Sequence, residues 1–336
     1  MSSSAKALLA DVQLEPGKPP MLQAGPGTGA PNWLAEHRDA LRAAVAEHGC
    51  LRVCGLGLRD AGEVTAAFRL LATDLMTERE AFAPRRIYSA GVYSSSRWPP
   101  NQVMCMHHEL SYALQFPGLM LFGCLSAASE GGATAVADSP TVFKTLPTEL
   151  TMRFEREGWL LTRNYGEDIG TSVAEAFGTD ERDAVERYCR ANAIEFEWQG
   201  DGRLRTRQRR PAVVRHSVTG QRCWFNQVAF LSEWTMDPEV REYLVDVYGA
   251  DALPFRTSFG NGDPVDADIV ELVNDAYERS TLREPWRAGD LMLVDNIRSA
   301  HNRDRFAGVR EVLVAMADPV RVADGSPAPT IMPSVS

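Results

Sequence analysis

The order of apolar and polar positions predicts a β-rich chain with helices near its start and in its middle. Apolar residues recurring every three to four positions indicate helices, and short continuous or alternating apolar runs indicate strands. Helices are expected over 33–45, 61–77, 179–193 and 265–279, with two short helical pieces on either side of Pro147. Strands are expected over 51–58, 118–126, 131–138, 194–198, 211–216, 223–231, 285–296, 299–301 and 310–316.

This order of elements lacks the regular strand–helix alternation of a doubly wound parallel sheet. We therefore expect a mainly β fold with helical additions, including a helical insert at about 140–193. A chain of 336 residues favours two domains by length alone. One domain over 33–320, with a Pro- and Gly-rich arm over 1–32 and a loose tail over 321–336, fits the pattern better.

Composition narrows the partners and the compartment. Asp and Glu (45) outnumber Lys and Arg (35), and the resulting net charge of −10 disfavours nucleic acid and anionic membranes as partners. No apolar run reaches the ~18–20 residues of a membrane span, and the first residues do not resemble a secretory signal. The six cysteines form no CxxC pair. These features predict a cytoplasmic protein, which could form a homo-oligomer.

The most informative stretch for chemistry is MHHELS, residues 106–111. In an extended segment side chains alternate between faces, so His107 and Glu109 point the same way and His108 points the other way. His301 follows the strand-like LMLVDNIRSA. Two histidines and one carboxylate form the facial triad of non-haem Fe(II) oxygenases. A surface ion pair at His107 and Glu109, with His301 capping a turn, is the simpler alternative.

Two further residues suggest that an anion binds nearby. Arg310 begins the strand REVLVAM and leads an otherwise apolar face. A buried guanidinium needs an anionic partner, which could be a protein acid or a dicarboxylate such as 2-oxoglutarate. Thr134 follows Gly131 and Gly132, and these glycines allow close backbone approach to a ligand. An ordinary strand threonine remains the alternative.

Together, four segments resemble the taurine dioxygenase/TfdA family of Fe(II)/2-oxoglutarate oxygenases, particularly the branch with syringomycin-type amino-acid hydroxylases. They are HHELSYALQFPG, LFGCLSAASEGGATAVADS, CWFNQ and PWRAGDLMLVDNIRSAHNRDRFAGVREVLVAM. The resemblance implies a double-stranded β-helix, a cupin-like jelly roll, for the domain. It also implies Fe(II) on His107, Glu109 and His301, with 2-oxoglutarate against Arg310 and Thr134 and O₂ as the second co-substrate.

The implied activity is hydroxylation of an unactivated C–H bond, with release of succinate and CO₂. The implied substrate is an amino acid or related small metabolite of a biosynthetic pathway, either free or tethered to a carrier protein. Desaturation, epoxidation and cyclisation use the same metal site and stay open. Halogenation is disfavoured because Glu109 is a carboxylate. A zinc hydrolase and a non-catalytic jelly-roll binding protein are the remaining alternatives, although the chain has no HExxH motif.

Weaker expectations concern the substrate and the surface. Gln102, in the block before the metal pair, is expected near the iron, and Trp224 and Asn226 share a face of CWFNQ that the resemblance assigns to the substrate pocket. For Trp224 and Asn226 plain core packing is the alternative. The basic run RLRTRQRRP (203–211) is expected to be a solvated strand edge, although it could receive an anionic substrate or a carrier protein.

Overall fold

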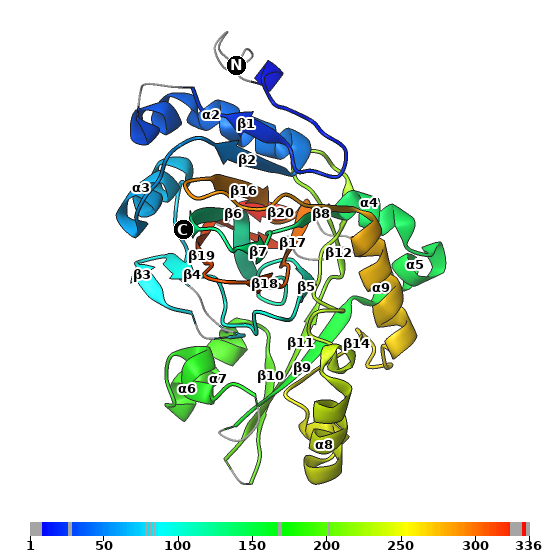
Figure 1. Cartoon of the computed structure of the whole chain (residues 1–336). Helices are drawn as coiled ribbons and strands as arrows, with labels where there is room; N and C mark the ends of the chain where they lie inside the picture. Colours follow the sequence, from blue (N-terminus) through cyan, green and yellow to red (C-terminus); the bar gives the residue numbers. More distant parts are fainter. Residues whose placement is uncertain are drawn as a thin grey trace.

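The computed structural model describes residues 9–25, 29–77, 80, 82–83, 85–166, 170–200, 202–322 and 331–333. The centre of the molecule consists of stacked strands, and helices are confined to its periphery (Figure 1). No helix in these described ranges is both long enough and apolar enough to cross a membrane.

The larger sheet has the strand order β1–β2–β16–β6–β19–β4–β3, with β20 paired to β19. Its strands are Met21–Gln23 (β1), Cys50–Cys54 (β2), Leu291–Asp295 (β16), Gln115–Ser126 (β6), Glu311–Val322 (β19), Val92–Ser94 (β4), Ile87–Ser89 (β3) and Ile331–Pro333 (β20). The long strands β6 and β19 pair along almost their whole length and form the spine of the sheet.

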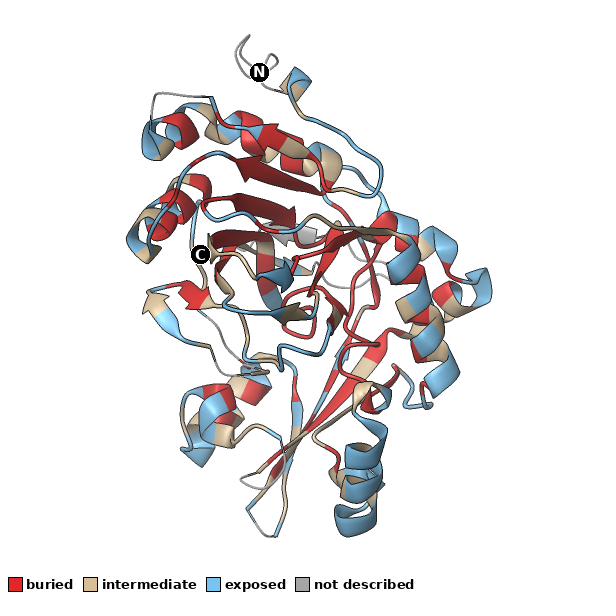
Figure 2. Ribbon diagram, viewed as in Figure 1, coloured by how far each residue is buried: buried red, intermediate tan, exposed pale blue. Residues whose placement is uncertain are grey.

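The continuous apolar runs of the central strands arise because both faces of the sheet are covered. Along β6, Leu119 and Leu121 pack into one apolar cluster together with the helices Ala30–His48 (α2) and Ala61–Leu71 (α3). The alternate residues Met120 and Phe122 belong to a second cluster inside the barrel. Figure 2 shows these central strands as buried, while helices α2 and α3 combine buried and exposed residues along their length.

The smaller sheet has the order β15–β8–β17–β5 and carries most of the chemistry discussed below. It shares the interior cluster with the larger sheet, since its residues Met106, Val136 and Ala300 belong to that cluster. Its strands are Thr281–Leu282 (β15), Val136–Asp138 (β8), Ser299–Arg303 (β17) and Met104–His107 (β5), and a short pair, Glu130–Gly131 (β7) with Phe306–Ala307 (β18), lies separately. Two facing sheets around one core confirm the jelly-roll expectation.

The middle of the chain forms an extension with the sheet β10–β11–β9–β14, visible in the lower part of Figure 1. Around Tyr165 it has a small apolar cluster of its own, distinct from the barrel interior. Its strands are Glu195–Trp198 (β10), Leu204–Arg210 (β11), Trp159–Tyr165 (β9) and Phe255–Phe259 (β14), and a separate hairpin pairs Val213–Arg215 (β12) with Arg222–Trp224 (β13). The remaining helices are Ser139–Thr145 (α4), Thr148–Glu157 (α5), Val173–Phe177 (α6), Arg182–Ala191 (α7), Pro238–Tyr248 (α8) and Ala267–Arg279 (α9), with 3₁₀ turns at Glu233–Thr235 and Ala250–Ala252.

The predicted helices are all present, and the helix expected over 61–77 ends earlier, at Leu71. The strand predicted over 223–231 is wrong beyond Trp224, because the chain continues as a buried irregular segment. Phe225, Val228 and Phe230 fill the core from this segment, which makes it apolar without making it extended. There the Asn226 side chain replaces strand partners by accepting a hydrogen bond from the Val228 N–H group.

The basic run is not a sheet edge, because β11 lies between β10 and β9. Two of its arginines have acidic residues directly opposite on β10, where Glu195 is the register partner of Arg207 and Glu197 is that of Arg205. Arg210 is buried and donates to the Tyr112 carbonyl.

Parts of the predicted arm and tail (1–8, 26–28, 323–330 and 334–336) lie outside the described residues. Within the arm, β1 pairs in parallel with β2. Within the tail, β20 pairs with β19.

Candidate metal and co-substrate site

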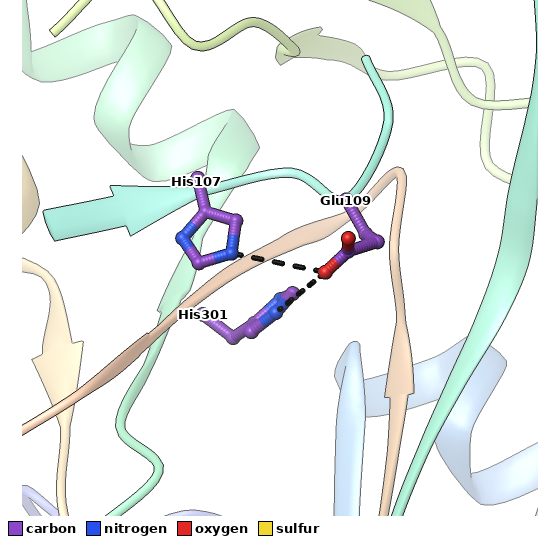
Figure 3. A group of neighbouring side chains, drawn as sticks. All are labelled: His107, Glu109 and His301. Atoms are coloured by element: carbon purple, nitrogen blue, oxygen red, sulfur yellow. Dashed lines mark ion pairs between the residues drawn. The ribbon is translucent and has the colours of Figure 1, made fainter. Parts of the chain in front are cut away.

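Three ligating side chains converge inside the barrel (Figure 3). One oxygen of Glu109, Oε2, lies 3.8 Å from His107 Nε2 and 3.7 Å from His301 Nε2. The three candidate ligand atoms all lie within 4.8 Å of one another, and all three residues are buried. Within the described ranges no other group of three His, Cys, Asp or Glu side chains meets this condition.

The β5–β17 ladder sets the two histidines opposite each other. His107 and His301 are direct partners in this antiparallel pair, and their ring centroids are 4.4 Å apart. Strand β5 ends at His107, so Glu109 lies in the turn that follows and not in an extended strand as predicted. Glu109 nevertheless faces the histidines, as Figure 3 shows, while the fully buried His108 contacts Asn296 instead.

Burial and neighbouring charges favour the protonation states that bind a metal. Burial, followed by repulsion from His107, lowers the pKa of His301 to about 4, so its imidazole is neutral near pH 7. Burial on its own would raise the pKa of Glu109. The Arg85 guanidinium, 3.0 Å from Glu109 Oε1, and the two imidazoles beside Oε2 outweigh it and hold that pKa well below its usual range. A neutral imidazole and an ionised carboxylate are the forms that ligate metals.

Further contacts fix the orientation of the His107 ring. Its Nδ1 lies 2.9 Å from the Cys105 carbonyl, which can only accept, so Nδ1 carries the proton and Nε2 offers a lone pair. Phe230 stacks on the same ring at a centroid distance of 4.7 Å. The ring is thus held with its ligating nitrogen toward Glu109 and His301.

A cationic site adjoins these ligands. The Arg310 guanidinium donates to the Gly132 carbonyl, the Ser95 hydroxyl and the Thr134 hydroxyl at 2.8, 3.3 and 3.2 Å. The Thr134 hydroxyl also accepts from Trp286 Nε1 at 3.1 Å. With two donors directed at its oxygen, Thr134 keeps its own O–H proton to donate to an anion.

Arg310 has no carboxylate partner within ion-pair distance among the described residues. Burial, reinforced by repulsion from Arg303, lowers the pKa of Arg310 to about 10, so the side chain is still charged near pH 7. A buried cation with only neutral partners is suited to receive an anionic ligand.

The metal and cationic sites share one cavity. Its walls come from both sheets and from the segment before β5: Arg85, Ser95, Ser96, Met104, His107, Glu109, Phe122, Thr134, His301, Asn302, Arg303, Arg310, Val312 and Val314. Five of the predicted site residues therefore meet here, namely the three candidate ligands together with Thr134 and Arg310.

The three residues expected to contact substrate do not line this cavity. Trp224 is fully buried and packs edge-on against Phe154 at a centroid distance of 5.1 Å. Asn226 donates to the Ala212 carbonyl within the core. Gln102 is exposed, and its main chain makes two hydrogen bonds: the carbonyl accepts from Arg303 and the N–H group donates to the Pro99 carbonyl.

Sequence reasoning missed Arg85, Ser95, Trp286 and Arg303. Trp286 belongs to the motif PWRAGD and could have been found there, because an indole N–H in an apolar setting needs an acceptor. Arg85 and Ser95 come before the metal motif in sequence, and only the path of the intervening loop brings their side chains close to it. Arg303 anchors the segment before β5 by donating to the carbonyls of Trp98, Pro99 and Gln102.

Comparisons with known proteins agree with this geometry. The dapdiamide synthesis protein DdaC of Enterobacter agglomerans is 33% identical over 276 residues, covering 82% of this chain and 84% of that protein. A clavaminate synthase-like protein of Arabidopsis thaliana is 26% identical over 284 residues, covering 80% of this chain and 82% of that protein.

Among solved structures, PvcB of Pseudomonas aeruginosa, an Fe, alpha-ketoglutarate dependent oxygenase, has the same fold. It superposes with a TM-score of 0.53 at 15% identity and covers 91% of this chain and 89% of that one. The model of the family "Taurine catabolism dioxygenase TauD, TfdA family" matches residues 14–316. This match includes every site residue described above and all strands of both sheets up to the middle of β19, and the chain belongs to the TauD/TfdA family of dioxygenases.

Proposed function

We propose that this dioxygenase, with Fe(II) as its metal and 2-oxoglutarate and O₂ as co-substrates, hydroxylates an unactivated C–H bond of an amino acid or related small metabolite. The proposal rests on one observation: two histidines and a carboxylate converge beside an arginine without an acidic partner. The 33% identity to a dapdiamide synthesis protein supports a biosynthetic substrate.

We assign the metal to His107, Glu109 and His301. The donor set of two imidazoles and one carboxylate is that of the facial triad, which leaves three positions for other ligands. The Arg85 contact engages Oε1 of Glu109 and leaves Oε2 directed at the histidines. Glu109 can therefore serve as a ligand through one oxygen only.

We assign the far carboxylate of 2-oxoglutarate to Arg310 and Thr134. Arg310 supplies positive charge, and Thr134 supplies an O–H donor whose direction is set by Arg310 and Trp286. These residues share the cavity with the candidate ligands, as a small dicarboxylate spanning both sites requires.

When bound, the iron would activate O₂, which is the oxidant that breaks the C–H bond, and 2-oxoglutarate would supply two electrons and leave as succinate and CO₂. The residues of the chain orient these groups and exclude water. Phe122, Val312 and Val314 line the apolar part of the cavity. Phe230 covers the outer side of the His107 ring.

We further propose that the protein works in the reducing cytoplasm. All six cysteines are free thiols, and burial raises the pKa of Cys54 and Cys124 to about 11. Buried, protonated thiols are typical of proteins from a reduced compartment. A carrier-tethered substrate and a homo-oligomeric state are compatible with this assignment and need their own tests.

Anaerobic addition of Fe(II) and 2-oxoglutarate to the metal-free protein tests the site. A weak visible charge-transfer band of an iron-chelated 2-oxo acid is expected. The band should vanish in the double variant Glu109→Ala plus His301→Ala and persist in His37→Ala, a histidine whose Nδ1 bonds only within α2. A folded wild-type protein without the band, or a band that survives the double variant, would contradict the assignment.

A panel of amino acids, both free and loaded on a carrier protein, tests the substrate class through stimulated succinate release. Mass analysis of the product then separates the outcomes. Gain of one oxygen supports hydroxylation or epoxidation, which NMR of the product distinguishes, whereas loss of two hydrogens would replace them by desaturation or cyclisation. Stimulation by none of these compounds would refute the amino-acid class.

A further inference from the structure

The peptide groups of Glu109 lack strand partners, because the β5 ladder ends two residues earlier. A buried N–H or C=O group without a partner is costly, and a metal ligand on such a segment would also be poorly oriented. The structure supplies the missing partners through a single side chain from another part of the fold.

That side chain is the amide of Asn296, at the end of the segment LMLVDN. The Glu109 N–H group donates to Asn296 Oδ1 at 2.8 Å, and Asn296 Nδ2 donates to the Glu109 carbonyl at 3.0 Å. The Asn296 side chain thus makes the two hydrogen bonds to the main chain of Glu109 that a residue of a neighbouring strand would make. Asn296 is fully buried, so water does not compete for these bonds.

Asn296 is itself fixed to the larger sheet. Its Nδ2 also donates to the Pro117 carbonyl at 2.9 Å, and its main-chain N–H group donates to the Gly118 carbonyl at 3.1 Å. Both acceptors belong to β6. The amide of Asn296 therefore ties the turn that carries Glu109 to the spine of the sheet.

The turn needs this support because its backbone is unusual. Leu110 has φ 54°, a left-handed conformation that bulky L-residues rarely adopt. His108, the residue before Glu109, is also held in place. Gln227 Nε2 donates to the His108 carbonyl at 2.6 Å, and His108 Nδ1 donates to the Asn296 carbonyl at 2.6 Å. Asn296 therefore bonds to His108 through its main-chain carbonyl and to the Glu109 peptide through its side chain.

We propose that Asn296 is a positioning residue that sets the Glu109 carboxylate for metal binding, while touching neither metal nor substrate. This inference rests on the proposed metal site. It assigns Asn296 a role that a purely structural asparagine would not have, because loss of the amide should change metal affinity as well as stability.

The test measures Co(II) affinity under anaerobic conditions, together with hydrogen exchange of the peptide around residues 104–113 in the metal-free protein. Asn296→Ala is expected to weaken Co(II) binding by about 10–100-fold, the usual effect of losing a residue that orients a metal ligand. Exchange of the 104–113 amides should accelerate.

Asn226→Ala is the matched control. Asn226 is equally buried and also makes two main-chain hydrogen bonds, to the Ala212 carbonyl and from the Val228 N–H group, but away from the metal site. It is expected to lose stability while keeping wild-type Co(II) affinity and wild-type exchange at 104–113. If Asn296→Ala does not fold, Asn296→Asp replaces it, because aspartate keeps the side-chain acceptor of asparagine and loses its N–H donors. Asn226→Asp is then the control.

Unchanged Co(II) affinity in the folded Asn296 variant, or equal weakening in the Asn226 control, would overturn the inference. Failure of the proposed function has a different result. In that case the wild-type protein itself would bind Co(II) no better than the double variant Glu109→Ala plus His301→Ala.

Discussion

Arg310 points to a function because, among the described residues, it has no acidic partner. Its guanidinium donates to a carbonyl and two hydroxyls, and among the described residues no acid neutralises it. Arg303 and Arg210 are also buried without an ion pair among the described residues, but they donate to main-chain carbonyls that hold loops and strands in place, and neither donates to the Thr134 hydroxyl. Arg52, by contrast, forms a buried ion pair with Asp290 at 2.7 Å.

We predict that Arg310→Gln weakens 2-oxoglutarate binding, because a charge-assisted hydrogen bond contributes about 1.5–3 kcal/mol, equivalent to roughly ten- to hundredfold in affinity. Titration of 2-oxoglutarate into the anaerobic Fe(II) protein measures the change. Co(II) affinity in the absence of 2-oxoglutarate should stay at the wild-type value. Equal 2-oxoglutarate affinity in both proteins would remove Arg310 from the site.

The metal ligands and the anion-binding pair could be predicted at this scale, because few histidines compete and Arg310 heads an apolar strand. Arg85 could not, since its approach to Glu109 depends on a loop without periodicity. The assignment of Trp224 and Asn226 to a substrate pocket met a different difficulty, since both lie in the core and outside the cavity described above. An aromatic ring and an amide satisfy a core as well as a pocket, and the residue types alone do not distinguish them.

At the scale of elements, the tight turn at Gly131 and Gly132 connects fold and site. Gly132 has φ +71°, and a Cβ atom there would lie 3.1 Å from Arg310 Cδ. The glycine therefore permits both the backbone conformation and the close approach of the arginine.

We predict that Gly132→Ala lowers 2-oxoglutarate affinity by displacing Arg310 and also lowers stability by about 1–3 kcal/mol through backbone strain. Gly57→Ala is the matched control, because Gly57 has φ +67° with open space around its Cβ position. Thermal unfolding and 2-oxoglutarate titration separate the two effects. A normal 2-oxoglutarate affinity in Gly132→Ala would show that Arg310 tolerates the added methyl group.

The two faces of the larger sheet predict different consequences of core substitutions. Phe68, on α3, belongs to the apolar cluster that the larger sheet forms with α2 and α3. Phe122, on β6, lies inside the barrel and edge-on to His301 at a centroid distance of 5.2 Å. Truncation of either ring to alanine should cost about 3–5 kcal/mol of unfolding free energy. Only Phe122→Ala should also weaken Co(II) binding. Chemical denaturation and metal titration of both variants test this contrast, and weakened binding in Phe68→Ala would contradict it.

Most elements were predictable because their patterns are strong: helices with one apolar face, and central strands that are apolar on both faces. The exceptions were segments in which tertiary contacts replace local regularity. The run at 223–231 is apolar but irregular, and the basic strand β11 is enclosed between the adjacent strand β10 and the more distant strand β9.

At the scale of the whole molecule, the candidate ligands connect parts of the chain that are far apart in sequence. His107 and Glu109 come from the first half of the barrel and His301 comes from the second. A metal bound here would therefore cross-link the two halves, and its binding energy would contribute to the stability of the entire domain.

We predict that Co(II) at a hundredfold excess over its dissociation constant stabilises the protein by about 2.7 kcal/mol. The melting temperature should rise by several degrees and return to the metal-free value on chelation. The double variant Glu109→Ala plus His301→Ala should show no rise. Equal rises in both proteins would locate the bound metal elsewhere.

The direct ladder pairing of His107 with His301 also bears on how such an enzyme can change over generations. Insertion of one residue between Ser299 and His301 would turn His301 to the opposite face and separate it from the other candidate ligands, whereas the ladder already contains an irregularity after His301. The extension around Tyr165 has its own apolar cluster and carries none of the ligands. The helices of that unit can therefore vary more freely between relatives than the ladder can, whereas Arg210 and Gln208 must still bond to the Tyr112 carbonyl, three residues after Glu109.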